Sequence, residues 1–169
     1  EFRRVLFRSL KTYAAASSTP VCASETLAFR QSFRELLEAR AAGIVMLDLS
    51  WCGGLSEAKK IATMAETHYL PVCPHNCGGP ILHYASAHLA ANIPNLFICE
   101  SVRKHYLEEY VGIVPDTLAA VNGELPLPPG PGSPLPDSRI CVPSSTPAGS
   151  LRSIVLPSDS VMRCGARVA

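Results

Sequence analysis

Four apolar runs, each ending in a residue capable of acid, base or metal chemistry, recur along the first hundred residues of the chain. The four residues are Glu25 after PVCAS, Asp48 within IVMLDLS, His75 after LPVCP and Glu100 after NLFIC. They lie 23, 27 and 25 residues apart, which is about the length of one strand, one crossover helix and two loops. The spacing predicts a repeated β/α unit. In a parallel β/α barrel, each of these residues would lie at a strand's carboxyl end, where active sites form.

The segments around these residues support a parallel sheet. IVMLDL is almost continuously apolar, which is typical of a strand covered on both faces. Apolar residues recur at helical spacing from Phe29 to Leu37, and Pro80 is placed for the first turn of a later helix. We expect about four parallel strands and three crossover helices within residues 20–114. A chain of 169 residues is too short for a closed eight-stranded barrel, which needs roughly 200 or more, so an α/β fold with a truncated barrel is predicted.

The flanking segments differ from this pattern. EFRRVLFRS at the start resembles a translated cloning scar, and residues 1–19 are expected to be a non-native or disordered lead-in. Residues 115–132 are a Pro/Gly-rich return segment, and VNGELPLPPGPG within it predicts an extended excursion and not a packed element. Residues 133–169 lack periodicity and are predicted to be a disordered tail.

Charge and cysteine content limit the possible partners and compartment. The net charge is +1 with scattered Lys and Arg, which gives no reason to propose a nucleic-acid or membrane partner. No apolar stretch approaches the roughly 20 residues of a transmembrane helix. The first residues make a poor signal peptide, so we expect a cytoplasmic protein. Four of the seven cysteines lie in or just after predicted strands, where reduced thiols pack as small hydrophobes, and a disulfide framework is not expected.

Asp48 and His75 form the most informative pair of candidate catalytic residues. A carboxylate at the end of a buried strand must be hydrogen-bonded or paired to stay charged, and His75 lies one strand along. An Asp that accepts from one imidazole nitrogen fixes the tautomer and leaves the other nitrogen as a general base. Glu100 could stay protonated in a desolvated pocket and donate to a substrate oxyanion. Glu25 offers a hard oxygen ligand for Mg²⁺.

Each candidate also has a purely structural interpretation. Glu25 could be a helix-start carboxylate, Glu100 could simply begin a loop, and His75 could be satisfied by local backbone. Three histidines within or near helices are expected to be surface or packing residues: His68, His83 and His88. The C-x-H-x-C pattern of Cys73, His75 and Cys77 is a weaker zinc candidate, because its gaps are shorter than the usual ligand spacing.

Taken together, PVCASE, DLSWCGGLSEAKKIATMAE, PVCPHNCGGPI and PNLFICE resemble the enolase superfamily, in its mandelate racemase and muconate lactonizing enzyme branch. VNGELPLPPGPG is similar to the segment by which that family returns to its capping domain. The resemblance covers residues 20–132 and implies the C-terminal half of a (β/α)7β TIM-like barrel. The first two metal ligands, a second base and the capping domain would then lie outside this chain.

The resemblance also implies a chemistry. Members of this branch bind Mg²⁺ through three carboxylates and remove the proton α to a substrate carboxylate. Glu25 would be the last metal ligand, His75 with Asp48 the base or acid, and Glu100 a hydrogen-bond partner of the substrate carboxylate. A metal is needed because a base alone cannot remove so weakly acidic a proton.

The implied substrate is a small carboxylate, an acid sugar, and the parent enzyme is expected to be a homo-oligomer. Dehydration is the first expectation. A racemase, epimerase or cycloisomerase reaction of the same family is the alternative. This chain alone is expected to be inactive and could instead be a non-catalytic barrel fragment that pairs with another chain.

Overall fold

The computed structural model describes residues 2–114, 116–127 and 132. Within them, β1 (Cys22–Ala23), β2 (Ile44–Leu47) and β3 (Val72–Pro74) form a parallel sheet in the order β1-β2-β3. Helix α2 (Phe29–Ala39) connects the first two strands, and α4 (Leu55–Thr67) lies between the second and third. All three strands therefore end at the same edge of the sheet. The predicted α/β fold with parallel strands is confirmed.

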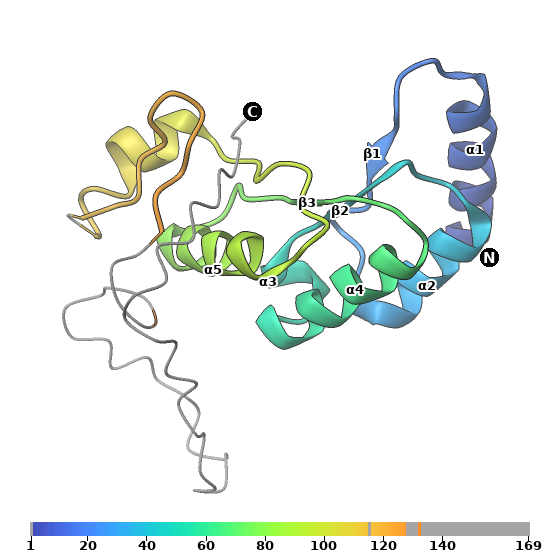
Figure 1. Cartoon of the computed structure of the whole chain (residues 1–169), viewed down its shortest axis with the longest axis horizontal. Coiled ribbons are helices and arrows are strands. Elements are labelled where there is room, and N and C mark those ends of the chain that lie inside the picture. The colour runs from blue at the N-terminus through green and yellow to red at the C-terminus, as the bar shows by residue number, and fades with distance from the viewer. Residues whose placement is uncertain (1, 115, 128–131, 133–169) are drawn as a thin grey trace, which may run out of the picture.

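Helices α2 and α4 lie along one side of the sheet, as Figure 1 shows. Helix α5 (Pro80–Asn92) packs against α4, and the one-turn helix α3 (Leu49–Cys52) follows β2 directly. The main core fills the space between sheet and helices with fully buried side chains, among them Phe33, Leu36, Val45, Leu47, Ile61, Val72 and Leu89. Alternate residues of the strands face this core, so the residues between them face the opposite side of the sheet.

The fourth predicted strand is reduced to one parallel bridge between Val72 and Leu96. The Phe97 amide donates to the Val72 carbonyl at 2.8 Å, and the Glu100 amide donates to the Pro74 carbonyl at 2.9 Å. Between these two hydrogen bonds the segment contains one residue more than β3 does, which is the geometry of a bulge. Pro74 also has no N–H to donate to the ladder. The segment therefore runs beside β3 without forming a regular strand.

Residues 2–16 form helix α1 (Phe2–Ala16), which corrects the expectation of disorder in the lead-in. Phe7 is buried in the main core, Leu10 packs against it, and α1 contacts α2. Apolar side chains three residues apart share one face of a helix, which explains why even this segment finds a packing partner. That residues 1–9 are non-native stays a prediction.

Residues 116–127, the part of the return segment that the structure describes in full, pack on the domain, whereas an extended excursion was expected for VNGELPLPPGPG. Leu118 and Leu125 are buried and, with Val114, form a second core against Tyr84 and Ala87 of α5. The segment lacks helical periodicity, but these apolar side chains still cover α5. Between this segment and the sheet, the chain after Glu100 forms a π-helix, η1 (His105–Glu109). The predicted disordered tail, residues 133–169, lies outside the described residues.

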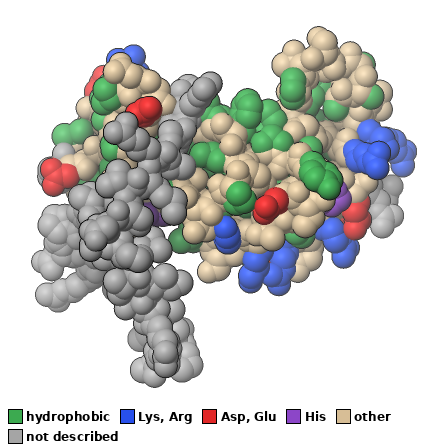
Figure 2. All heavy atoms as spheres, viewed as in Figure 1, with side chains coloured by type: hydrophobic (Ala, Val, Ile, Leu, Met, Phe, Trp, Pro, Cys, Tyr) green, Lys and Arg blue, Asp and Glu red, His purple; other side chains and the backbone are tan. Residues whose placement is uncertain are grey.

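The charged side chains mark the outer surface of the helical layer. Figure 2 shows Lys and Arg side chains at the lower edge of the molecule and at its right-hand end. Arg30, Arg34, Lys59 and Lys60 belong to α2 and α4, whose inner sides contribute to the main core. Among the residues that the structure describes, none of the helices combines the length and apolar character that crossing a bilayer requires.

Candidate active site

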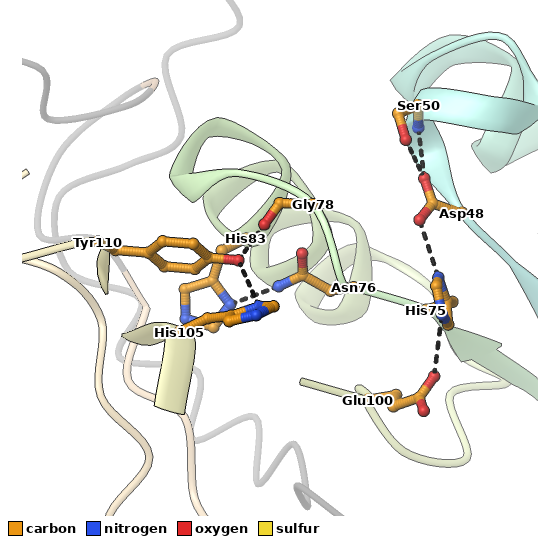
Figure 3. Close-up of polar contacts among 9 residues, drawn as sticks. All are labelled: Asp48, Ser50, His75, Asn76, Gly78, His83, Glu100, His105 and Tyr110. Carbon is orange, nitrogen blue, oxygen red and sulfur yellow. Dashed lines mark hydrogen bonds and ion pairs between the residues drawn. The ribbon is translucent and has the colours of Figure 1, made fainter. Parts of the chain in front are cut away.

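Asp48, His75 and Glu100 form a row across the carboxyl edge of the sheet (Figure 3). The His75 Nδ1 atom lies 2.9 Å from Asp48 Oδ2, and its Nε2 atom lies 3.9 Å from Glu100 Oε2. Each residue follows a different strand or strand-like segment, and the parallel arrangement brings them together from positions far apart in the sequence. The imidazole ring thus lies between two carboxylates.

Asp48 lies directly after β2, and its side chain is fixed by hydrogen bonds to the loop that it belongs to. Its side chain is buried, and it caps α3 by accepting the Ser50 amide at 2.7 Å on Oδ1. The Ser50 hydroxyl also donates to Oδ1, while Oδ2 is left for His75. A buried carboxylate with three donors has its desolvation offset by hydrogen bonds. The Asp48 carboxyl group is therefore fixed in orientation.

The position of Asp48 determines which nitrogen of His75 carries a proton. An ionised carboxylate only accepts hydrogen bonds, so His75 Nδ1 must donate to it. In the neutral ring, Nε2 then has a free lone pair directed toward Glu100. The alternative of a loop histidine satisfied by local backbone does not match this geometry, because the ring's partner is Asp48, 27 residues away.

Glu100 completes the row without hydrogen-bonding to His75. A distance of 3.9 Å is too long for a direct hydrogen bond, and Glu100 Oε2 is buried with no hydrogen-bond partner in the described part of the chain. An imidazole lone pair and a carboxylate oxygen repel each other unless a proton lies between them. The arrangement suits a site in which a proton and a substrate oxygen occupy this interval.

Glu25 lies in the turn directly after β1, at the same edge of the sheet. The chain enters this turn through Ser24, whose φ is 102° and whose hydroxyl donates to the Met46 carbonyl at 2.8 Å. The Cys73 thiol lowers the pKa of Cys22 by hydrogen-bonding to it, while burial and the charges of Glu100 and Glu25 oppose this shift. Both carboxylates are thus close enough to this thiol to act on its pKa.

The described residues do not by themselves complete a metal centre. No group of three or more His, Cys, Asp or Glu side chains within residues 2–114, 116–127 and 132 is arranged to hold an ion. The set Cys73, His75 and Cys77 therefore does not form the alternative zinc site. Glu25 has the oxygen chemistry that Mg²⁺ prefers, but it is a single ligand.

Two features of the site escape the sequence pattern. Ser50 helps to hold Asp48, and the D-x-S spacing of an Asx-type cap is the signal that could have indicated it. Asn76 and His83 are buried next to the row and hydrogen-bond each other at 2.7 Å. His83 was expected to be a surface or packing residue, and no periodicity indicated its partner.

An open apolar pocket of about 530 Å³ lies beside the row. It is lined by residues at the starts of α3, α4 and α5, such as Ser50, Leu55 and Ile81, together with Ile113. None of the four candidate residues lines it. The acid and base chemistry is therefore at the carboxyl edge of the sheet, and the pocket is a neighbouring apolar surface.

Comparison with known proteins identifies a family that the chain matches. The family described as "Enolase C-terminal domain-like" matches residues 5–134. D-xylonate dehydratase from Haloferax volcanii is 34% identical over 122 residues, covering 72% of this chain and 29% of that protein. D-galactarolactone cycloisomerase from Agrobacterium fabrum is 33% identical over 143 residues, covering 76% of this chain and 36% of that protein.

A solved structure extends the similarity to three dimensions. An enolase of the mandelate racemase subgroup from Agrobacterium tumefaciens has a TM-score of 0.69 and 54% identity, covering 73% of this chain and 34% of that one. The chain therefore spans about a third of the length of the proteins that it matches.

Proposed function

Because this chain belongs to the enolase C-terminal domain-like family, in its mandelate racemase and muconate lactonizing enzyme branch, we propose that it is the catalytic part of an acid-sugar dehydratase. The substrate is a small carboxylate, and His75 removes the proton on its α-carbon. The observation that carries this proposal is the row in which His75 Nδ1 lies 2.9 Å from Asp48 and Nε2 faces Glu100. Similarity to D-xylonate dehydratase supports dehydration as the outcome.

Each residue of the row has one task in this mechanism. Asp48 accepts the Nδ1 proton of His75 and so keeps Nε2 as the base, and it stabilises the imidazolium that forms when Nε2 takes the substrate proton. Glu100, when protonated, donates a hydrogen bond to the substrate carboxylate as negative charge develops there. The same imidazolium can then return its proton to the departing β-hydroxyl group.

Members of this superfamily are generally Mg²⁺-dependent, and Glu25 has the ligand chemistry for that ion. When bound, Mg²⁺ would stabilise the negative charge on the substrate carboxylate. The described residues supply one carboxylate toward such a site, so we propose that the remaining ligands come from other strands of a longer barrel. The relatives are about three times as long as the stretch that matches this chain, which supports that proposal.

A cycloisomerase, racemase or epimerase reaction is the second candidate. The D-galactarolactone cycloisomerase similarity favours it, because that match covers 76% of this chain. Both reaction classes begin with removal of an α-proton, so the row serves either. The two are separated by product analysis, since dehydration releases water and leaves a keto acid, whereas isomerisation conserves the substrate's mass.

The test is α-proton exchange in a hybrid enzyme. Residues 20–132 replace the matching segment of the Agrobacterium tumefaciens enolase, and acid sugars are incubated with Mg²⁺ in deuterium oxide. We expect exchange in the hybrid and a loss of at least about 100-fold in His75→Asn, because a general base contributes this much or more. His68→Asn, at the exposed end of α4, is the matched control and should retain exchange. Exchange at an undiminished rate in His75→Asn would remove His75 from the mechanism.

A further inference from the structure

His83 is a buried imidazole whose protonation state is fixed by its neighbours. Its Nε2 atom lies 2.8 Å from the Leu118 carbonyl, which can only accept, so Nε2 carries the proton. Burial lowers the pKa of His83, which keeps the ring neutral near pH 7. The Nδ1 atom is then an acceptor, and the Asn76 carboxamide donates to it at 2.7 Å.

Aromatic side chains hold this imidazole in one orientation. The ring stacks on Tyr106 with centroids 5.7 Å apart and planes 7° apart, and Tyr110 lies at 5.9 Å. The Tyr110 hydroxyl in turn donates to the Gly78 carbonyl and lies 3.4 Å from His105 Nδ1. The loop after β3 is therefore held at two points, Asn76 and Gly78, by residues of α5 and the segment around η1.

Asn76 directly follows His75 and points to the other side of the backbone (Figure 3). It is fully buried, and within the described residues its Oδ1 atom has no hydrogen-bond partner. An unpaired buried oxygen costs free energy. The Asn76 carboxamide is therefore oriented by its hydrogen bond to His83, even though this leaves its own oxygen without a partner. On the other flank, the His75 amide donates to the Leu47 carbonyl at 2.8 Å.

His75 is thus fixed from two sides, by the sheet through Leu47 and by the buried pair through Asn76. We propose that Asn76 and His83 are positioning residues for His75: the neutral imidazole of His83 holds the Asn76 carboxamide, and this sets the backbone from which His75 reaches Asp48. The proposal rests on the role proposed for His75. It states that His83 is physically coupled to the hydrogen bond between His75 and Asp48.

The coupling is measurable in the 169-residue chain without any activity assay. The Nδ1 proton of His75 that is donated to Asp48 gives its own resonance in proton–nitrogen NMR spectra, and its exchange with solvent reports how often that bond opens. We expect exchange to be about fivefold to tenfold faster in His83→Leu and in Asn76→Ala, because each removes the buried hydrogen bond that holds the loop.

A conservative variant separates hydrogen bonding from simple filling of space. Gln can donate to the Leu118 carbonyl and accept from Asn76, so His83→Gln should restore exchange to within about twofold of the wild type. His88→Leu is the matched control on the same helix, since His88 bonds the Gly132 carbonyl on the other side of α5, and it should leave the His75 resonance unchanged. Circular dichroism and melting temperature verify that each variant is folded.

Two results would overturn the proposal. One is an unchanged His75 exchange rate in folded His83→Leu and Asn76→Ala. The other is a His83→Gln variant as fast as His83→Leu, which would mean that the imidazole fills space and nothing more. If His83→Leu does not fold, Asn76→Ala decides alone: faster exchange supports the coupling and an unchanged rate rejects it. A hybrid enzyme that retains α-proton exchange in His75→Asn would overturn the proposed function without touching this coupling.

Discussion

At the scale of single residues, the thiols of Cys22 and Cys73 are neighbours with opposite properties. The pKa of Cys22 is lowered chiefly by the hydrogen bond from the Cys73 thiol, and that same bond is the largest cause of the raised pKa of Cys73. Cys22 is exposed and Cys73 is buried. Thiolates are the reactive form, so Cys22 combines access with reactivity.

We expect Cys22 to be alkylated by iodoacetamide at pH 7.5 several times faster than Cys77. Cys77 is also exposed, but partial burial and the charges of Glu100 and Asp48 raise its pKa. Peptide-resolved mass spectrometry measures both rates in one sample. Cys73→Ala should slow labelling of Cys22 because its donor is lost, whereas Cys52→Ala on the helical side should not. Faster labelling of Cys77 than of Cys22 would contradict the assignment.

His83 predicts a specific loss of stability in mild acid. Burial lowers its pKa below the ordinary value of 6.5, so between the folded pKa and 6.5 the unfolded chain binds more protons than the folded chain. The free energy of unfolding should therefore decrease as the pH falls below about 6.5, by about 1.4 kcal/mol for each unit of pKa difference at most. The decrease ends once the pH lies below the folded pKa.

Urea unfolding at pH 7.5 and pH 5 measures this loss. His83→Gln cannot titrate, so its stability should change less between the two pH values than that of the wild type. His88→Gln, which alters a half-buried histidine of the same helix, should change as much as the wild type does. Equal pH dependence in all three proteins would mean that His83 is not the titrating group.

At the scale of elements, α2 begins without a side-chain cap of its own. Its N-cap residue is Ala28, and the missing acceptor comes from α4: Glu57 Oε1 accepts the Arg30 amide at 3.0 Å. The carboxylate also lies 3.6 Å from the Arg30 guanidinium and 3.8 Å from the Lys60 ammonium. Glu57 thus links two helices of the outer layer where a Ser or Asp would normally act locally.

We expect Glu57→Ala to lower the free energy of unfolding by about 1 kcal/mol, the typical loss of an N-cap acceptor. Glu38→Ala is the matched control, because Glu38 pairs with Arg34 at 3.5 Å and both side chains are 63% exposed. It should cost about 0.5 kcal/mol or less. Equal losses in the two variants, measured by urea unfolding, would show that Glu57 contributes only a surface ion pair.

The sequence predicted the elements whose signals are local. The periodicity from Phe29 to Leu37 and the position of Pro80 correctly indicated α2 and α5, and the spacing of the four polar residues indicated parallel strands. The single bridge at Leu96 was not predictable, because a bulge depends on how two strands meet. The burial of Phe7 likewise depends on a partner that only the folded chain provides.

The candidate site follows the same division. The Asp48–His75 contact was expected, because consecutive parallel strands bring their carboxyl ends together. The Asn76–His83 pair joins a loop to the middle of a helix, and nothing in hydrophobic spacing distinguishes a buried histidine from a surface one. His83 is buried because it packs against Tyr106 and Tyr110, which lie more than twenty positions further along the sequence.

At the scale of the whole molecule, helices α2, α4 and α5 form a layer on one side of the sheet (Figure 1). Val45 and Val72 face the helical core, so Met46 and Cys73 face the opposite side, which we call the inner face. Leu96 packs with the core, which places its neighbour Phe97 on the inner face as well, and Phe97 is 55% exposed. An apolar sheet face beside unpaired backbone edges favours association with another surface.

We therefore expect the isolated chain to self-associate through the inner face. Light scattering coupled to size-exclusion chromatography should give a mass above 18.1 kDa that increases with protein concentration. Phe97→Lys should shift the mass toward the monomer, because a charge on this face would lose its hydration on association. Tyr69→Lys is the matched control: Tyr69 is 96% exposed but lies in the turn between α4 and β3, so it should leave association unchanged. A constant monomer mass at every concentration would contradict the expectation. Equal effects of both substitutions would instead mean that added charge, and not the inner face, controls association.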